Sequence, residues 1–313
     1  MTASHLSIPN LRTARRVRSA VHAAVGCAGW SVEMLEQRQY LASYVANFNT
    51  GAPPGSILYG SATVDATGGT TGGKLSLTRV GAGNRGSLIL PDFDPSHSAR
   101  AFSISFKMLI GGGSGADGIG FSFGTPPGEA FADFGYLTSH NLTVNFNTFG
   151  GDGDGPWIYA FATPGGGQIN SNINPRTSPA RYVPVIVTWQ NDRLSVRYDG
   201  IDVFPGGVAL SGWNALVGDK FGFGGRIGGL WDNHFIDDVS VSTVTTPDAT
   251  GTPDLLAASD TGVSNTDNIT KASSLTFSVP TAETGALVEL LRDDVVVASR
   301  TGSGELTLSL IHI

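Results

Sequence analysis

The chain has 313 residues and a formal charge of −7. Glycine accounts for 43 of the residues, and this share of the chain is roughly twice the usual ~7%. It contains no apolar run of about 18 residues, which excludes a membrane-spanning helix, and its acidic balance without a basic stripe argues against nucleic-acid binding. Cys27 is the single cysteine, so an intrachain disulfide framework and a thiolate zinc site are excluded.

Residues 1–42 differ in character from the rest of the chain. Four arginines crowd this start: Arg12, Arg15, Arg16 and Arg18. The mildly apolar run Ala20–Trp30 follows, and together they form the pattern of a weak export signal. The string Val32–Ser43 then resembles the "L-E-x-R-x-L-L-S" element near the start of many secreted proteins of planctomycete-type bacteria. The matching residues are Leu35, Glu36, Arg38 and Leu41.

This resemblance implies an export-associated leader over residues 1–42, largely disordered or helical, and hence a secreted or cell-surface protein. The alternative is an amphipathic N-terminal helix without a special role.

Residues 43–245 consist of short runs rich in Val, Ile, Phe and Thr, separated by Gly, Pro, Asn and Asp. Between Phe102 and Met108, apolar residues alternate with polar ones, as in a strand with one buried face. The candidate strands are Ser56–Ala62, Lys74–Thr78, Gly86–Leu90, Ala101–Leu109, Gly118–Gly124, Leu142–Phe149, Trp157–Phe161, Val183–Gln190, Arg193–Tyr198, Lys220–Gly224 and Phe235–Ser242. No segment has a clear helical period, so we predict an all-β sandwich of about 200 residues.

Residues 246–253 form a polar linker, and residues 254–307 are predicted to form a smaller β module. Its predicted strands are Leu275–Val279, Leu287–Arg292 and Val295–Ala298, with a hairpin turn at Asp293–Asp294. The opening of this module resembles bacterial Ig-like repeats, which occur in tandem on surface adhesins. The module is shorter than a complete Ig-like domain, so we predict a partial one.

Residues 308–313 resemble the translation of a transposon-end sequencing adapter, and they are set aside from the fold. The alternative is that they form a hydrophobic strand.

Several segments of residues 43–245 resemble, in order, L-type (legume-like) lectins of the concanavalin A-like lectin/glucanase superfamily. They are Ser56–Ala62 with Lys74–Thr78, Phe102–Phe106, Ala116–Phe121, Val144–Phe149, and Phe221–Gly229 followed by Asn233–Asp237. The resemblance implies a concanavalin A-like β-sandwich (jelly roll) that binds glycans or polysaccharides.

Asp117 is the first candidate binding residue. An ionised carboxylate only accepts hydrogen bonds, which suits a pair of adjacent sugar hydroxyls. The resemblance implies that Asp117 accepts these bonds, that Gly118 lets the chain present it, and that Gly135 supplies a backbone N–H. The alternative is a turn aspartate in the glycine-rich loop 111–118.

Aromatic side chains also matter, because sugar rings stack on them. Trp157, Tyr159, Trp213 and Trp231 lie in or beside predicted loops. Of these, we expect Trp157 and Trp231 to lie near the sugar-binding cleft. Trp189 alternates with apolar residues and is expected in the core.

Asn145, Asn147 and Phe149 share one face of a predicted strand. In the lectin family, carboxylates at the first two places hold a transition metal and calcium, whereas this chain has two amides. The following loop contributes Asp152 and Asp154. Two interpretations remain: a single Ca²⁺ held by Asn147, the Phe149 carbonyl, Asp152 and Asp154, or a lost metal site. We expect no transition metal, because uncharged amides seldom hold one.

A third polar cluster comprises Asp232, Asn233, His234, Asp237 and Asp238. Consecutive strand residues point to opposite faces, so Asp237 and Asp238 are not expected to act jointly. His234 is interpreted as a hydrogen-bonded structural histidine rather than a ligand.

The same superfamily includes glucanases, which place two carboxylates at i and i+4 of one strand. The corresponding positions here are Asn145 and Phe149, which cannot act as acid or nucleophile. We therefore predict that the chain is not an enzyme but the carbohydrate-binding domain of an exported surface or adhesin protein. The alternative is a structural or protein-binding sandwich with a degenerate sugar site, and a glycoside hydrolase is the third class considered. Sugar specificity is expected to reside in the loops around residues 160–181.

Overall fold

The computed structural model describes residues 20–23, 30–36, 40–79, 83–125, 140–151, 155–164, 166–245, 253–292 and 295–311. Two compact units divide the chain: one runs from Leu41 to Thr245, and the other combines the residues before and after it. Every regular element described is a β-strand, which confirms the predicted all-β class. The described residues contain no helix long and apolar enough to span a membrane.

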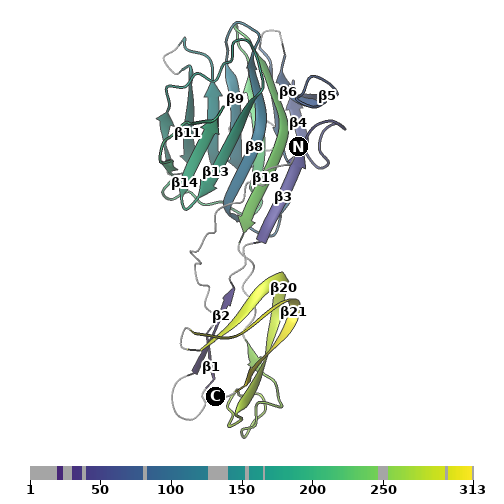
Figure 1. Ribbon diagram of the computed structural model, residues 1–313, viewed down its shortest axis with the longest axis vertical. Helices are drawn as coiled ribbons and strands as arrows, with labels where there is room; N and C mark the ends of the chain where they lie inside the picture. Colours follow the sequence, from purple (N-terminus) through teal and green to yellow (C-terminus); the bar gives the residue numbers. More distant parts are fainter. Residues whose placement is uncertain are drawn as a thin grey trace. The chain divides into compact units, whose positions relative to one another are not determined.

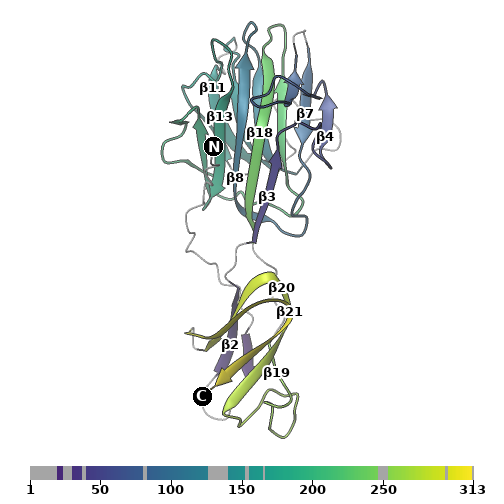
Figure 2. The ribbon, with the colours of Figure 1, turned by 45° about the vertical axis from the view of Figure 1, so that its right-hand side comes forward.

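The Leu41–Thr245 unit is built on two antiparallel sheets (Figure 1). The first has seven strands in the order β12-β11-β10-β9-β17-β7-β4. Their bounds are β4 (Ile57–Gly60), β7 (Arg85–Ile89), β9 (Gly118–Gly124), β10 (Asn141–Asn147), β11 (Trp157–Thr163), β12 (Gly166–Asn170) and β17 (Lys220–Arg226). Figure 2 shows β4 beside β7 at one edge of this sheet.

The second sheet has nine strands in the order β15-β14-β13-β8-β18-β6-β5, with β16 paired to β14 and β3 paired to β18. Their bounds are β3 (Tyr40–Ala46), β5 (Thr63–Asp65), β6 (Lys74–Thr78), β8 (Ala99–Gly111), β13 (Val183–Gln190), β14 (Arg193–Tyr198), β15 (Ile201–Asp202), β16 (Val208–Ala209) and β18 (Asn233–Thr245). The long strands β8 and β18 pair along most of their length and form the centre of the sheet.

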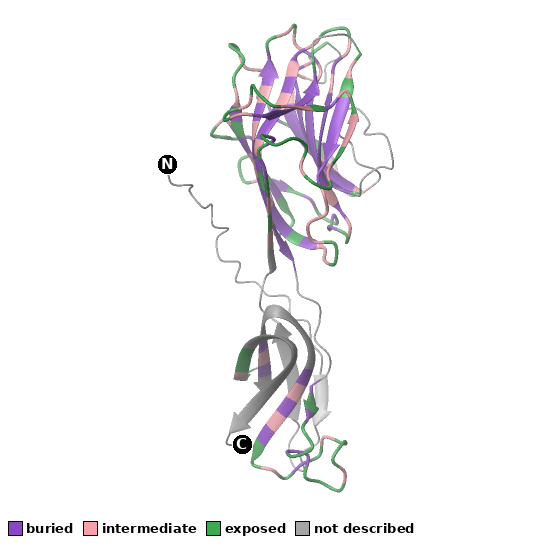
Figure 3. Cartoon of the chain, turned by 90° about the vertical axis from the view of Figure 1, so that its right-hand side faces the viewer, coloured by how far each residue is buried: buried purple, intermediate pink, exposed green. Residues whose placement is uncertain are grey.

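The core between the sheets is aromatic. Phe102 of β8 packs edge-to-face on Phe221 of β17, with ring centroids 5.2 Å apart, and Phe123 stacks on Phe221 at 4.3 Å. Such ring pairs add to the free energy of burial by about 0.5–1.5 kcal/mol each. Buried residues therefore run along the strands, and exposed ones gather in the loops (Figure 3).

The positions of three aromatic side chains test the sequence predictions. Trp189 lies in the core, as predicted, at 3% exposure. Trp213 lies in a loop, as predicted, and it is buried there and packs edge-to-face on Trp189 at 4.8 Å. Tyr159 is likewise buried in β11. Trp189 and Trp213 belong to the core cluster between the sheets, whereas Tyr159 stacks on Phe161 of its own strand.

The smaller unit holds a five-stranded sheet. Its strands are β1 (Ala20–Ala23), β2 (Trp30–Glu36), β19 (Asp254–Leu255), β20 (Ser274–Arg292) and β21 (Val295–Ile311). Residues 1–42 were predicted to be largely disordered or helical, but their described parts, residues 20–23, 30–36 and 40–42, are strands, and β2 pairs with β20 over Val32–Glu36. β20 and β21 form the predicted hairpin, and β21 extends through the adapter-like residues up to Ile311. The likeness to an Ig-like repeat remains a prediction.

Candidate functional site

Asp117 lies directly before β9 and is fixed by its backbone on two sides. Its N–H donates to the Arg226 carbonyl (3.1 Å), and its carbonyl accepts from the Thr148 N–H (2.8 Å). The Ala116–Asp117 peptide bond is cis. The structure therefore places Asp117 between the end of β17 and the bend that begins at Thr148, so the aspartate and the bend predicted to hold calcium are neighbours.

The Asp117 carboxylate forms an ion pair with Arg226. The Arg226 Nε lies 3.1 Å from Asp117 Oδ2, and the two side chains are 42% and 14% exposed. A Cβ placed on Gly228 would stand 3.6 and 3.8 Å from the two carboxylate oxygens, which is ordinary contact distance. Position 228 thus places no side chain over the carboxylate, whose Oδ2 is nevertheless buried.

Gly118 supports Asp117 through the backbone. It has φ +147°, and a Cβ there would lie 2.2 Å from the Phe146 carbonyl oxygen. Only glycine permits both the backbone conformation and the close approach of β9 to β10. Gly118 is itself buried, so it offers no exposed contact atom, and its role in presenting Asp117 to a ligand stays a prediction.

Five residues form a row across the end of the seven-stranded sheet, called here the terminal row. The strand register pairs Trp157 with Asn147, Asn147 with Gly118, Gly118 with Arg226, and Arg226 with Arg85. Directly opposite residues point to the same face of a sheet. The terminal row therefore brings predicted residues 118, 147 and 157 together with two arginines.

Arg226 and Arg85 were not among the predicted site residues. Arg226 belongs to the segment Phe221–Gly229 that resembles the closing lectin motif, so its position was within a recognised motif. Arg85 stands outside every motif, and only the pairing of β7 with β17 places it beside Arg226.

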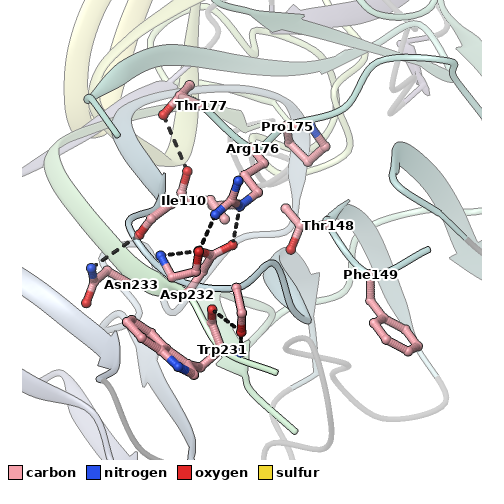
Figure 4. A network of polar contacts seen from close by, with 12 residues as sticks. Ile110, Thr148, Phe149, Pro175, Arg176, Thr177, Trp231, Asp232 and Asn233 are labelled. Carbon is pink, nitrogen blue, oxygen red and sulfur yellow. Dashed lines mark hydrogen bonds and ion pairs between the residues drawn. The ribbon is translucent and has the colours of Figure 1, made fainter. Parts of the chain in front are cut away.

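The loop that leads to Asp117 is anchored by a buried carboxylate (Figure 4). Asp232 has no exposed surface, and its Oδ1 accepts from the Gly113 N–H at 2.8 Å. Arg176 donates from Nε to Asp232 Oδ2 at 2.9 Å, and its Nη2 donates to the Gly113 carbonyl. Three segments far apart in sequence thus meet at one ion pair, and they hold residues 111–117 in place.

Trp231 packs against the same loop. Its carbonyl accepts from the Ser114 N–H at 2.7 Å, and a Cβ on Gly113 would lie only 2.5 Å from the indole Cε3. The indole is half-buried, so part of it remains accessible to a ligand. Trp157 is also half-buried, and its Nε1 has no hydrogen-bond partner in the described part of the chain.

Two of the four predicted calcium ligands lie together. Asn147 Oδ1 accepts from the Phe149 N–H at 2.9 Å, and a Cβ on Gly155 would lie 2.3 Å from the Phe149 carbonyl oxygen and 2.9 Å from Asn147 Nδ2. Asp152, Asp154 and the predicted sugar contact Gly135 lie outside the described residues. Among the residues that are described, no group of three or more His, Cys, Asp or Glu side chains could hold a metal.

His234 is a buried structural histidine, as predicted. It has no exposed surface, and its Nδ1 lies 2.7 Å from Thr78 Oγ1. Burial lowers the pKa of His234 to about 3, because the imidazolium would be desolvated.

The prediction that Asp237 and Asp238 face opposite ways is wrong. A bulge shifts the register after Asp237, and Asp238 has φ +49°. As a result, Thr70 Oγ1 lies 2.6 Å from Oδ2 of both aspartates. The two carboxylates therefore secure the loop that contains Thr70 rather than diverging.

Comparison with known proteins gives a likeness of fold. No family model matches the sequence, and no curated protein matches it significantly. One similar solved structure is the exoplasmic/lumenal domain of VIP36 in a Ca²⁺/Man3GlcNAc-bound form, with 17% identity, a TM-score of 0.48, and coverage of 69% of this chain and 93% of that one.

Two further structures have comparable scores. Lectin II from Ulex europaeus has 18% identity and a TM-score of 0.46, over 64% of this chain and 98% of the lectin. The carbohydrate recognition domain of Emp46p, in its potassium-bound form, has 16% identity and a TM-score of 0.43, over 62% of this chain and 97% of that domain.

Proposed function

We propose that the Leu41–Thr245 unit binds a glycan over the terminal row, with Asp117 as the hydrogen-bond acceptor for sugar hydroxyls. The observation that supports this proposal is the fixed Asp117 carboxylate, which lies beside Gly228 and keeps 14% of its side chain exposed, although its Oδ2 is buried. Backbone hydrogen bonds and the Arg226 ion pair hold this acceptor before any ligand arrives. A preorganised acceptor loses little entropy on binding.

The aromatic residues would supply the apolar contacts. Trp157 belongs to the terminal row, and Trp231 packs on the loop that precedes Asp117. A sugar ring stacked on either indole would gain burial of its apolar face.

We also propose that a Ca²⁺ ion binds at the bend after β10. Asn147 and the Phe149 carbonyl provide neutral oxygen atoms of the kind that calcium accepts, and Asp152 and Asp154 would provide the charge. When bound, the ion would hold the bend whose Thr148 N–H donates to the Asp117 carbonyl. Calcium would thereby stabilise the position of Asp117.

We propose that the site binds its glycan without hydrolysing it. Asn145 is fully buried on β10, and Asn147 is nearly so, and neither amide can serve as a catalytic carboxyl group. The export-like segment in residues 1–42 and the resemblance to adhesin repeats support a place on the cell surface or in a secreted adhesin.

The ion pair between Asp117 and Arg226 supports a second candidate function, in which the unit is a structural or protein-binding sandwich. In that case Arg226 and Asp117 would join β17 to the start of β9 as a structural contact, and the carboxylate would serve no ligand.

A glycan array probed with the full chain, with and without Ca²⁺, separates the two candidates. We expect the wild type to bind and Asp117→Asn to lose roughly 10–100-fold in affinity, because hydrogen bonds to a charged group are worth about 1.5–3 kcal/mol. Gly228→Phe would cover the carboxylate and abolish binding. Gly229→Phe is the matched control, since a Cβ there meets no atom within 4 Å.

If the wild type binds no glycan under either condition, the structural candidate is correct. If Gly228→Phe and Gly229→Phe bind equally well, the glycan does not lie against Asp117.

A further inference from the structure

A small pocket lies between the two sheets at the end of the sandwich opposite the terminal row. Phe123 of β9 and Phe221 of β17 line it. The terminal row takes its residues from the other ends of these two strands, where Gly118 pairs with Arg226. Strand β9 runs from Gly118 to Gly124, which at about 3.4 Å per residue separates its ends by roughly 20 Å. The pocket, called here the end pocket, is therefore remote from the proposed glycan site.

Two buried oxygen atoms of the end pocket have no hydrogen bond. Thr243 of β18 lines the pocket at 4% exposure, and its Oγ1 has no hydrogen-bond partner in the described part of the chain. Asp94 also lines it, and no described residue donates a hydrogen bond to its buried Oδ2. Since buried acceptors without donors destabilise a protein, both oxygens favour a ligand with hydrogen-bond donors. The enclosed space of about 20 Å³ has room for about one water-sized group.

The charge of the end pocket favours a cation. Asp92, Asp94 and Asp219 contribute carboxylates, and no lysine or arginine is among the described residues that line it. The basic groups beside these carboxylates are histidines, which unlike lysine carry no permanent charge. His97 Nδ1 lies 2.7 Å from Asp94 Oδ1, and His140 Nδ1 lies 3.5 Å from Asp219 Oδ2. Burial raises the pKa of the Asp219 carboxyl, and a cation nearby would offset this desolvation.

Apolar side chains surround the polar atoms of the end pocket. The Phe93 ring lines the pocket and stacks on Phe221, with centroids 5.8 Å apart and an interplanar angle of 5°. Leu216 also lines it and is 50% exposed, and its neighbour Val217 is 60% exposed. A cation is attracted to the face of an aromatic ring, and an alkyl chain covers exposed apolar side chains. These surroundings suit an occupant with a compact cationic end and an apolar stem.

We infer that the end pocket binds a primary ammonium group at the end of an alkyl chain, as in a small alkylamine or a lysine side chain. An ammonium group is compact and has three donors and no acceptor, so it matches the two unpartnered oxygens and the carboxylates around them. A quaternary ammonium has the same charge, but it has no N–H and its head is larger than the enclosed space. A water molecule would fit the space, but it would leave the carboxylate charge without a counter-ion.

Thermal unfolding of the full chain in the presence of n-butylammonium tests the inference. A ligand that binds the folded state raises the thermal midpoint as its concentration increases. We expect n-butylammonium to raise the midpoint, whereas n-butyltrimethylammonium and n-butanol, at the same concentration and ionic strength, should not. The first comparison removes the N–H donors at constant charge, and the second removes the charge while it keeps the alkyl chain.

Two substitutions locate the ammonium in the end pocket. Asp94→Asn keeps the shape of the side chain and removes its charge, so it should weaken n-butylammonium binding about tenfold or more. Thr243→Val removes an unpartnered buried hydroxyl, so it should fold at least as stably as the wild type and bind the amine about fivefold more weakly. Asp202→Asn is the matched control, because this side chain of β15 is 76% exposed and its loss changes the net charge equally. The control should bind the amine as the wild type does.

A second probe identifies the source of the ammonium group. Nα-acetyl-lysine methylamide presents a lysine side chain on a capped backbone. If it raises the midpoint as n-butylammonium does, the end pocket accepts a lysine of a peptide or protein. If n-butylammonium alone raises the midpoint, the ligand is a free alkylamine. Both results support the inference.

Three results would overturn the inference. An equal rise of the midpoint with n-butyltrimethylammonium would show a general attraction of cations to a chain of charge −7. No rise with n-butylammonium would show that the pocket holds no ammonium group. Wild-type affinity for the amine in Thr243→Val, or in a folded Asp94→Asn, would show that the amine binds elsewhere. None of these results bears on the proposed glycan site.

Discussion

Acid should destabilise the sandwich through His234. This imidazole is fully buried and neutral in the folded state, where burial lowers its pKa to about 3. In the unfolded chain its pKa returns to about 6.5, so the unfolded state binds the proton more readily. Protonation of His234 in the unfolded state therefore leaves the free energy of unfolding unchanged above about pH 6.5 and lowers it progressively as the pH falls toward 3.

The size of the effect follows from the two pKa values. Each pH unit within this window changes the free energy of unfolding by about 1.4 kcal/mol, so His234 should cost about 2 kcal/mol between pH 7 and pH 5. The comparison variant is His234→Gln, which does not titrate and retains an amide that can hydrogen-bond to Thr78.

Urea unfolding of the full chain, followed by tryptophan fluorescence, measures this difference. Trp189 and Trp213 lie in the core and report on the sandwich. All other titrating groups are common to both proteins, so they cancel when the pH-dependent losses are compared. We expect the wild type to lose about 2 kcal/mol more than His234→Gln. Equal losses in the two proteins would refute the reasoning.

Other changes test the supports of the proposed site. Gly118→Ala should lower the free energy of unfolding by more than about 2 kcal/mol, because its Cβ collides with the Phe146 carbonyl; an unchanged urea midpoint would contradict this. Asp232→Asn should cost about 2 kcal/mol and weaken glycan binding, whereas Arg181→Gln, which breaks an exposed ion pair with Asp199, should cost less than about 1 kcal/mol. If the protein binds calcium, a free Ca²⁺ concentration of 100 times the Kd should raise the free energy of unfolding by about 2.7 kcal/mol, and EDTA should reverse this gain. A thermal midpoint that changes with neither Ca²⁺ nor EDTA would argue for a lost metal site.

The strand content could be predicted because period-two alternation is a local property. The run Ala101–Leu109 predicts β8, and Val183–Gln190 coincides with β13. Short strands such as β15 and β16 were missed, since two residues carry no period. The N-terminal strands were missed for another reason: β2 is a strand through its pairing with β20, which lies at the far end of the chain.

The candidate site was predictable only in part. Asp117 and Gly118 could be found from one motif, and Asn147 from another. The pairing of Arg85 with Arg226 depends on register between β7 and β17, and a single strand's pattern does not fix the register to its partner. The bulge at Asp238 likewise redirects a side chain that strict alternation would have pointed the other way.

The anchoring of the 111–117 loop limits how this architecture could be redesigned. Asp232 is 56 residues from Arg176 and 119 residues from Gly113 along the chain. Grafting the loop alone onto a foreign scaffold would leave its amide and carbonyl groups without their counterparts. A working graft would have to include all three segments. Substitutions in the exposed loop residues around them would leave the contact of Asp232 with Arg176 and Gly113 intact.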